Sequence, residues 1–152
     1  MPKTYRVTPM IRFVNRLIRL LIRWNIAPAQ TYLLTVPGRK SGNLYSTPVS
    51  LVQEDGRRWL VSPYGQVSWV KNARAAGQVT LSRGGKSETV RIQELGPEDS
   101  APVLQKYLGL EKIVQPYFEV TPDSPLVAFV AEAARHPVFL IVDTSTEQGE
   151  NL

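Results

Sequence analysis

TYLLTVPGRKSGNLYSTP, residues 31–48, joins two apolar runs through a basic turn that also contains glycine. The turn carries two adjacent cations, Arg39 and Lys40, followed by the hydroxyl group of Ser41. Glycine lets a backbone approach a bound anion closely, while backbone N–H groups and cations offset its negative charge. The stretch therefore predicts a β-hairpin whose loop binds a phosphate or a carboxylate. The alternative interpretation is a solvated basic hairpin tip.

The composition excludes several classes of site. A chain of 152 residues suggests one domain with a sizeable core. It has no cysteine, which excludes disulfides, thiolate metal sites and a cysteine nucleophile. Its single histidine, His136, argues against a multi-histidine metal site, and we expect no metal. Because His136 precedes an apolar run, we interpret it as a packing residue where a strand begins.

Charge is distributed unevenly along the chain. The formal net charge is +5, yet no Asp or Glu occurs before Glu54. We therefore expect an anionic partner to meet the first third of the chain. Nucleic acid, an anionic membrane surface and an anionic cofactor all fit this asymmetry.

Residues 10–25 have the pattern of an amphipathic helix. Arginines recur every three or four positions beside wide apolar flanks, at Arg12, Arg16, Arg19 and Arg23. The charges interrupt the run too often for a bilayer span. The helix packs on the domain or lies in a membrane interface, and we expect residues 10–24 to associate with an anionic membrane. The arginines lie among apolar residues rather than beside aromatic side chains placed to stack bases, so we expect no nucleic-acid binding.

Hydrophobic alternation and turn residues predict an α+β fold with about six mostly antiparallel strands. The predicted strands are 31–36, 44–54, 58–62, 78–83, 86–94 and 136–142, and the predicted helices are 68–76, 97–108 and 126–134, with a short helical piece within 110–118. Short antiparallel hairpins close most economically into a small barrel or half-barrel. We expect a helical extension at 1–28, a barrel domain at 29–143 and a polar tail at 144–152.

A second group of candidate site residues lies on the predicted helix 68–76. Trp69 and Asn72 are three positions apart and therefore share a helix face. Tryptophan offers an apolar wall for a ring system, and the Asn72 side chain offers a donor and an acceptor. The alternative interpretation is a core tryptophan beside a solvated asparagine.

Taken together, the two groups resemble the deazaflavin-dependent nitroreductase family, whose members are reductases that use coenzyme F420 and have a split, FMN-binding-like β-barrel. The motifs that carry the resemblance are Gly38-Arg39-Lys40-Ser41-Gly42, Thr47-Pro48, Trp69 with Asn72, and Arg135-His136-Pro137. Their order and spacing match from about residue 31 to residue 142. An amphipathic helix at the N-terminus is also similar in kind to that of family members.

The resemblance implies a cofactor site built from three segments. Arg39, Lys40 and Ser41 would hold the phosphate and the anionic oligoglutamate tail of F420. The residues implied to line the rest of the cofactor are Tyr45, Ser46, Thr47, Pro48, Val49 and Ser50, then Val61, Ser62, Pro63 and Tyr64, then Ser68, Trp69, Val70, Lys71 and Asn72. By position, we expect Tyr64 and Tyr117 to orient the acceptor as catalytic residues.

The function implied is hydride transfer from reduced F420 to a small electron-poor acceptor, such as an enone or lactone, a quinone or a nitroaromatic compound. Three alternatives stay open: a non-catalytic F420-binding or storage protein, an FMN-dependent split-barrel oxidoreductase, and a membrane adaptor built on the N-terminal helix. FMN has one phosphate and no glutamate tail, so it needs a shorter cationic surface than F420. We expect a cytoplasmic protein, peripheral at the inner face of the plasma membrane.

Overall fold

The computed structural model describes residues 16–18 and 30–142. Residues 16–18 are helical. The remainder of the predicted helix 10–25, most of the extension 1–28 and the tail 144–152 lie outside the described residues.

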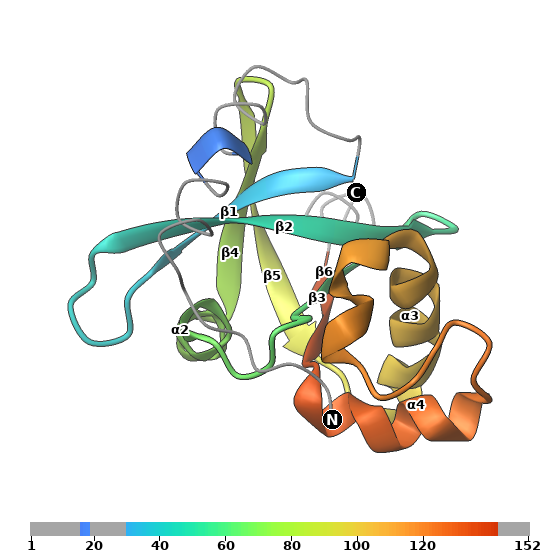
Figure 1. Cartoon of the computed structure of the whole chain (residues 1–152). Coiled ribbons are helices and arrows are strands. Elements are labelled where there is room, and N and C mark those ends of the chain that lie inside the picture. Colours follow the sequence, from blue (N-terminus) through green and yellow to red (C-terminus); the bar gives the residue numbers. More distant parts are fainter. Residues whose placement is uncertain (1–15, 19–29, 143–152) are drawn as a thin grey trace, which may run out of the picture.

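The described part of the chain forms a closed barrel of antiparallel strands (Figure 1). The strands are β1 (Thr31–Pro37), β2 (Leu44–Glu54), β3 (Arg57–Val61), β4 (Gln78–Arg83), β5 (Lys86–Glu94) and β6 (Val138–Val142). Around the barrel they follow the order β1-β2-β3-β6-β5-β4, and each neighbouring pair is antiparallel. The prediction of about six antiparallel strands closing into a small barrel is confirmed.

Turn chemistry sets the register of the β2–β3 hairpin. Asp55 has φ 53° and Gly56 has φ 78°, so both central residues adopt the left-handed conformation of a tight hairpin turn. This turn pairs Glu54 with Arg57 and places Leu51 opposite Leu60. Since side chains alternate along a strand, Leu51 and Leu60 then share the inner face of the barrel.

The helices fall into two groups on different sides of the barrel (Figure 1). They are α2 (Ser68–Ala76), α3 (Pro97–Leu110), α4 (Leu126–Glu132) and the short 3₁₀ helices η1 (Lys112–Tyr117) and η2 (Ala133–Arg135). Helix α2 lies beside β1 and β4, while α3 and α4 lie together on the other side. Helix α2 ends at Gly77, whose φ of 74° and N–H bond to the Ala73 oxygen make a glycine cap.

The described residues form two hydrophobic cores. The first fills the barrel and includes Val70 and Ala73 of α2, which are fully buried, so α2 is anchored in the barrel interior. The second lies outside the barrel, between strands β2 and β3 and the group formed by α3, η1 and α4. Val52 and Val61 point into it from the two strands. Burying large side chains such as Phe129 stabilises this layer by roughly 1.5–3 kcal/mol each.

The predicted start of the last strand is wrong by two residues. Strand β6 begins at Val138, because His136 ends η2 with φ −136° and ψ 83° and Pro137 has no N–H to give to the sheet. The predicted helix 126–134 likewise ends its α-helical part at Glu132 and continues as η2. The short helical piece predicted within 110–118 is confirmed as η1.

Candidate functional site

The β1–β2 loop is closed by its own backbone. Gly38 N–H donates to the Asn43 oxygen at 2.7 Å, and Gly42 N–H donates to the Gly38 oxygen at 2.9 Å. Ser41 Oγ accepts a bond from Asn43 N–H at 3.2 Å. With the backbone folded in this way, the side chains of Arg39 and Lys40 are left exposed to solvent.

Tyr45, a predicted site residue, lies against the start of this loop. A Cβ atom built on Gly38 would lie 2.7 Å from Tyr45 Cε2, so only glycine leaves room for the ring in its present place. The Tyr45 side chain nevertheless keeps 53% of its surface exposed. It therefore forms a partly solvated aromatic surface at the start of the loop that carries the two cations.

Asn72 connects the loop to helix α2. Its Oδ1 atom accepts a bond from the backbone N–H of Arg39 at 3.1 Å and a second from Arg39 Nη1 at 2.8 Å. Asn72 is 4% exposed, so the interpretation of a solvated asparagine is wrong. The structure thus joins the two groups of residues that the sequence singled out.

The charge environment of Arg39 and Lys40 differs from that of four other surface cations. Each of those four cations has a carboxylate partner: Arg58 pairs with Glu88, Arg74 with Glu94, Lys106 with Glu54 and Arg135 with Glu119. Within residues 16–18 and 30–142, no carboxylate pairs with Arg39 or Lys40. Their positive charge is therefore available to an external anion.

Strand β2 presents a polar, uncharged surface next to the loop. Val49 and Leu51 point into the barrel core, so alternation turns Ser46, Pro48 and Ser50 to the outer face. Ser46 Oγ and Thr35 Oγ1 of β1 lie 2.8 Å apart and share a hydrogen bond. These outward residues are half-buried, as suits the wall of a shallow binding surface.

The loop between β3 and α2 holds the predicted tyrosine. Ser62 Oγ donates to the Gly65 oxygen at 2.6 Å, and Gly65 has φ 88°. Tyr64 and Tyr117 contact each other edge-on, with ring centroids 4.9 Å apart. The structure therefore brings the two predicted catalytic residues side by side, although they lie far apart in the sequence. Their catalytic role stays a prediction.

The other predicted site residues divide by burial. Val49, Val61, Ser62 and Val70 are buried, so their side chains are part of the cores or of the loop and only their backbone can meet a ligand. Trp69 is half-buried on the barrel core, with its ring centroid 6.0 Å from that of Phe139. The predicted site residues that retain exposed surface are Ser41, Thr47, Pro63, Ser68 and Lys71.

A buried Glu132–His136 pair lies behind the Ser62–Gly65 loop, and the sequence analysis missed it. His136 Nε2 lies 3.0 Å from Glu132 Oε1, which also accepts the Glu119 N–H at 3.1 Å. The imidazole stacks on Phe118 with centroids 3.8 Å apart. Glu132 and His136 are four positions apart, the spacing of facing side chains on a helix, but the predicted helix ends at residue 134 and His136 falls in a predicted strand, which hid that signal.

Burial lowers the pKa of His136, because desolvation disfavours the imidazolium; the Glu132 carboxylate and the nearby carbonyls of Ser62 and Pro63 oppose this more weakly. His136 Nδ1 has no hydrogen-bond partner, so those carbonyls lie near it without forming a bond. The folded state therefore takes up this proton less readily than the unfolded state does.

We expect the free energy of unfolding to fall as the pH drops below about 6.5, the ordinary histidine value, with a slope of at most about 1.4 kcal/mol per pH unit from this group. His136→Gln should remove that slope, and the chain has no other histidine to replace it. Urea unfolding of both proteins between pH 5 and 8 measures the difference. A wild-type stability that rises toward pH 5.5 relative to the variant would mean that a charged pair with Glu132 is favoured instead.

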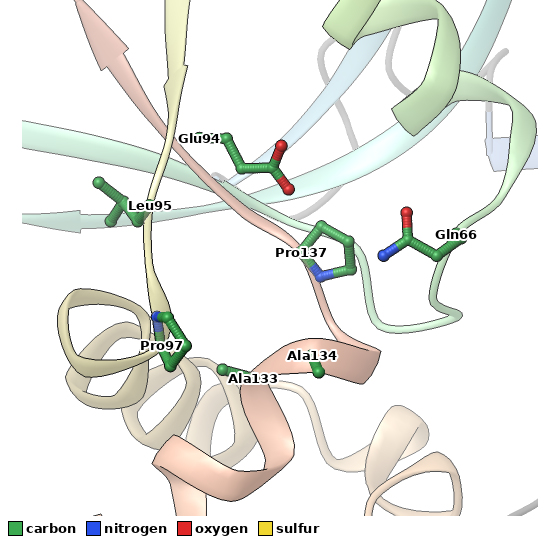
Figure 2. A pocket seen from close by; sticks show the side chains of 7 residues that line it. All are labelled: Gln66, Glu94, Leu95, Pro97, Ala133, Ala134 and Pro137. Atoms are coloured by element: carbon green, nitrogen blue, oxygen red, sulfur yellow. The ribbon is translucent and has the colours of Figure 1, made fainter.

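A small pocket lies between Gln66, which follows the Ser62–Gly65 loop, and Pro137 (Figure 2). It measures about 140 Å³ and is lined by Gln66, Glu94, Leu95, Pro97, Ala133, Ala134 and Pro137, where the end of β5 meets α3 and η2. Its charged lining residue, Glu94, is tied to Arg74 by two hydrogen bonds, and Gln66 accepts a third from Arg74. A small pocket with an acidic lining does not suit an anionic ligand. The cationic β1–β2 loop at Arg39 and Lys40 remains the candidate site for such a ligand.

Comparison with known proteins agrees with this fold. A family model described as F420H(2)-dependent quinone reductase matches residues 12–121, more than half of the chain. A solved structure described as a domain-swapped dimer is 21% identical with a TM-score of 0.56, covering 89% of this chain and 100% of that chain. A NimC/NimA family protein from Clostridium acetobutylicum is 11% identical with a TM-score of 0.53, covering 82% and 81%.

A third solved structure, an F420-H2 dependent reductase (FDR-A), is 24% identical with a TM-score of 0.48, covering 75% of this chain and 95% of that chain. No curated protein matches the chain significantly. The closed six-stranded barrel with flanking helices, together with the two likenesses whose TM-scores are 0.56 and 0.53, confirms the predicted split β-barrel fold.

Proposed function

The chain belongs to the F420H2-dependent quinone reductase family, which confirms the resemblance to F420-dependent reductases, and we propose that it transfers a hydride from reduced coenzyme F420 to a quinone or another electron-poor acceptor. As a member, it is an oxidoreductase whose cofactor is reduced F420. The acceptor is the part of the function that we propose. The observation that supports the use of F420 is the cationic loop at Arg39 and Lys40, which pairs with no carboxylate of the described residues and is held against α2 beside an uncharged wall.

The residues of this surface fit an elongated anion that ends in a flat ring. Arg39 and Lys40 supply charge-assisted donors for a phosphate and a glutamate tail. Beyond them, the outward side chains of Ser46, Pro48 and Ser50 carry no charge, as a neutral ring system requires. The cations at one end and the neutral wall at the other match the two ends of F420.

Reduced F420 supplies the hydride from carbon 5 of its deazaflavin. The chain's own residues have the simpler tasks of holding the acceptor against that surface and excluding water. We propose that Tyr64 or Tyr117 donates a hydrogen bond to the acceptor oxygen on which charge builds. Their edge-on contact restricts both rings, and Tyr64 keeps 36% of its surface exposed to a ligand.

The test is to supply reduced F420 with a panel of quinones, enones, lactones and nitroaromatics and to follow cofactor oxidation. We expect oxidation of the cofactor with quinones. When deuterium is placed at carbon 5 of the cofactor and an enone is the acceptor, the deuterium should appear bound to carbon in the reduced product. Tight F420 binding without oxidation across the panel would favour a storage protein. Stronger binding of FMN than of F420 would contradict the cofactor assignment.

We also propose that residues 10–24 hold the protein at an anionic membrane, where lipophilic quinones dissolve. Within residues 16–18, Arg16 is exposed and Leu17 exposes 48% of its surface. No helix in the described part of the chain has the length and apolar character to cross a bilayer. The protein should sediment with anionic vesicles at low salt and be released at high salt; if it stays in the supernatant at low salt, this segment has another role.

A further inference from the structure

We propose that Asn72 acts on the cofactor through Arg39: it is a positioning residue for the cation that meets the anionic tail, and it does not bind the cofactor itself. This inference rests on the proposed function and says how its anion site is held in place.

The hydrogen bonds of Asn72 are the first support. Its Oδ1 accepts both the Arg39 backbone N–H, at 3.1 Å, and Arg39 Nη1, at 2.8 Å. Both partners are donors, so the carboxamide oxygen must face them. One atom of Asn72 therefore holds the backbone and the guanidinium of Arg39 together. At 4% exposure, little of the Asn72 side chain is left to meet a ligand.

The position of Asn72 on α2 is the second support. Its helix neighbours Val70 and Ala73 are fully buried in the barrel core, so Asn72 stands on an anchored element. Arg39 stands on an exposed loop with a long, flexible side chain. Binding an anion requires that side chain to give up rotamer freedom, and a partner that holds it beforehand reduces this cost. Asn72 thus preorganises the cation.

The absence of charge on Asn72 is the third support. Arg74 is held by the carboxylate of Glu94, and Arg135 by that of Glu119, and each of these pairs is neutral as a whole. The carboxamide of Asn72 supplies the same kind of acceptor oxygen without a negative charge. Arg39 is therefore fixed in place while its full charge remains available to the cofactor.

Two substitutions separate positioning from charge. Asn72→Ala removes both bonds to Arg39 and should weaken F420 binding about tenfold, because two hydrogen bonds to one group are lost. Asn72→Asp keeps the shape and both acceptor bonds but pairs Arg39 with a carboxylate. It should also weaken F420 binding about tenfold and, unlike Asn72→Ala, make the affinity less sensitive to salt. Ala75→Ser, on the exposed face of α2, is the matched control and should leave the affinity unchanged.

The ligands are F420 and the deazaflavin riboside that lacks the phosphate and the glutamates, titrated at several salt concentrations by fluorescence. Neither Asn72 variant should change riboside binding, and Asn72→Ala should cost less affinity when Arg39 is already alanine. Equal losses for both ligands, or the same loss in both Arg39 backgrounds, would make Asn72 a direct ligand and overturn the inference. Unchanged F420 affinity in both variants would also overturn it.

The failure of the proposed function would look different, because wild-type protein would then bind no F420. Thermal unfolding identifies a variant that does not fold. If Asn72→Ala fails to fold, the near-isosteric Asn72→Asp still tests the inference through its salt dependence.

Discussion

Replacing Arg39 and Lys40 together by alanine is expected to weaken F420 binding at least about tenfold. Charge-assisted hydrogen bonds contribute roughly 1.5–3 kcal/mol each when well formed, and water screens these exposed side chains, so the expectation is a lower bound. The salt dependence of binding should fall as well, because fewer ion pairs form. Titration of the purified protein with F420 and with FMN measures both quantities. Wild-type protein should bind F420 more tightly than FMN, because only F420 carries a tail for the second cation.

The matched control is Arg57→Ala with Lys86→Ala, which changes the net charge equally at two exposed positions on other hairpins. Its F420 affinity should equal that of the wild type if the loop, rather than the overall charge, binds the cofactor. Unchanged affinity in the Arg39/Lys40 variant would rule out this site.

Trp69→Ala is expected to lower turnover with reduced F420 roughly a hundredfold, since a displacement of about 1 Å at a reacting centre can have that effect. Trp69 lies half-buried on the barrel core beside Phe139, on the helix that carries Asn72. Removing the indole leaves a gap between α2 and the barrel. We expect α2 to shift toward that gap while Val70 and Ala73 keep it attached to the core, and Arg39 would move with it. The measurement is kcat with the best acceptor of the panel, alongside thermal unfolding to confirm that the variant folds.

Trp69→Phe is the control, because a smaller aromatic ring keeps the contact with Phe139 and should retain most of the turnover. If Trp69→Ala folds and turns over as fast as the wild type, Trp69 is a packing residue only, and the position of α2 does not limit the reaction.

The two predictions depend on one connection, the pair of hydrogen bonds between Asn72 and Arg39. In the proposed site, Trp69 helps to hold α2 in place, Asn72 connects α2 to the loop, and Arg39 would meet the ligand. A change at any of the three should therefore affect binding of the anionic tail more than binding of the uncharged riboside.

Several elements follow from the sequence by itself because their causes are local. Asp55-Gly56 supplies the positive φ angles that a two-residue hairpin needs. Gly77 ends α2, and Pro97 begins α3 ahead of two acidic residues at the positive end of the helix dipole. Alternation of apolar residues identified the strands, and the basic turn after Pro37 marked the loop. Each of these signals acts within a few residues, so it can be read without knowing the fold.

Only the tertiary structure decided which of these pieces meet. Closing the barrel required β1 to pair with β4 and β6 to lie between β3 and β5, and strand patterns alone do not specify such partners. The contact between Tyr64 and Tyr117 depends on how η1 packs against the barrel. Asn72 had two interpretations from the sequence, a cofactor contact or a solvated residue, and the structure shows it buried and bonded to Arg39. The physical reason is that an asparagine side chain has the same local sequence preferences whether it contacts a cofactor, faces solvent or bonds to Arg39. Only the packing of α2 against the β1–β2 loop determines which donors reach it.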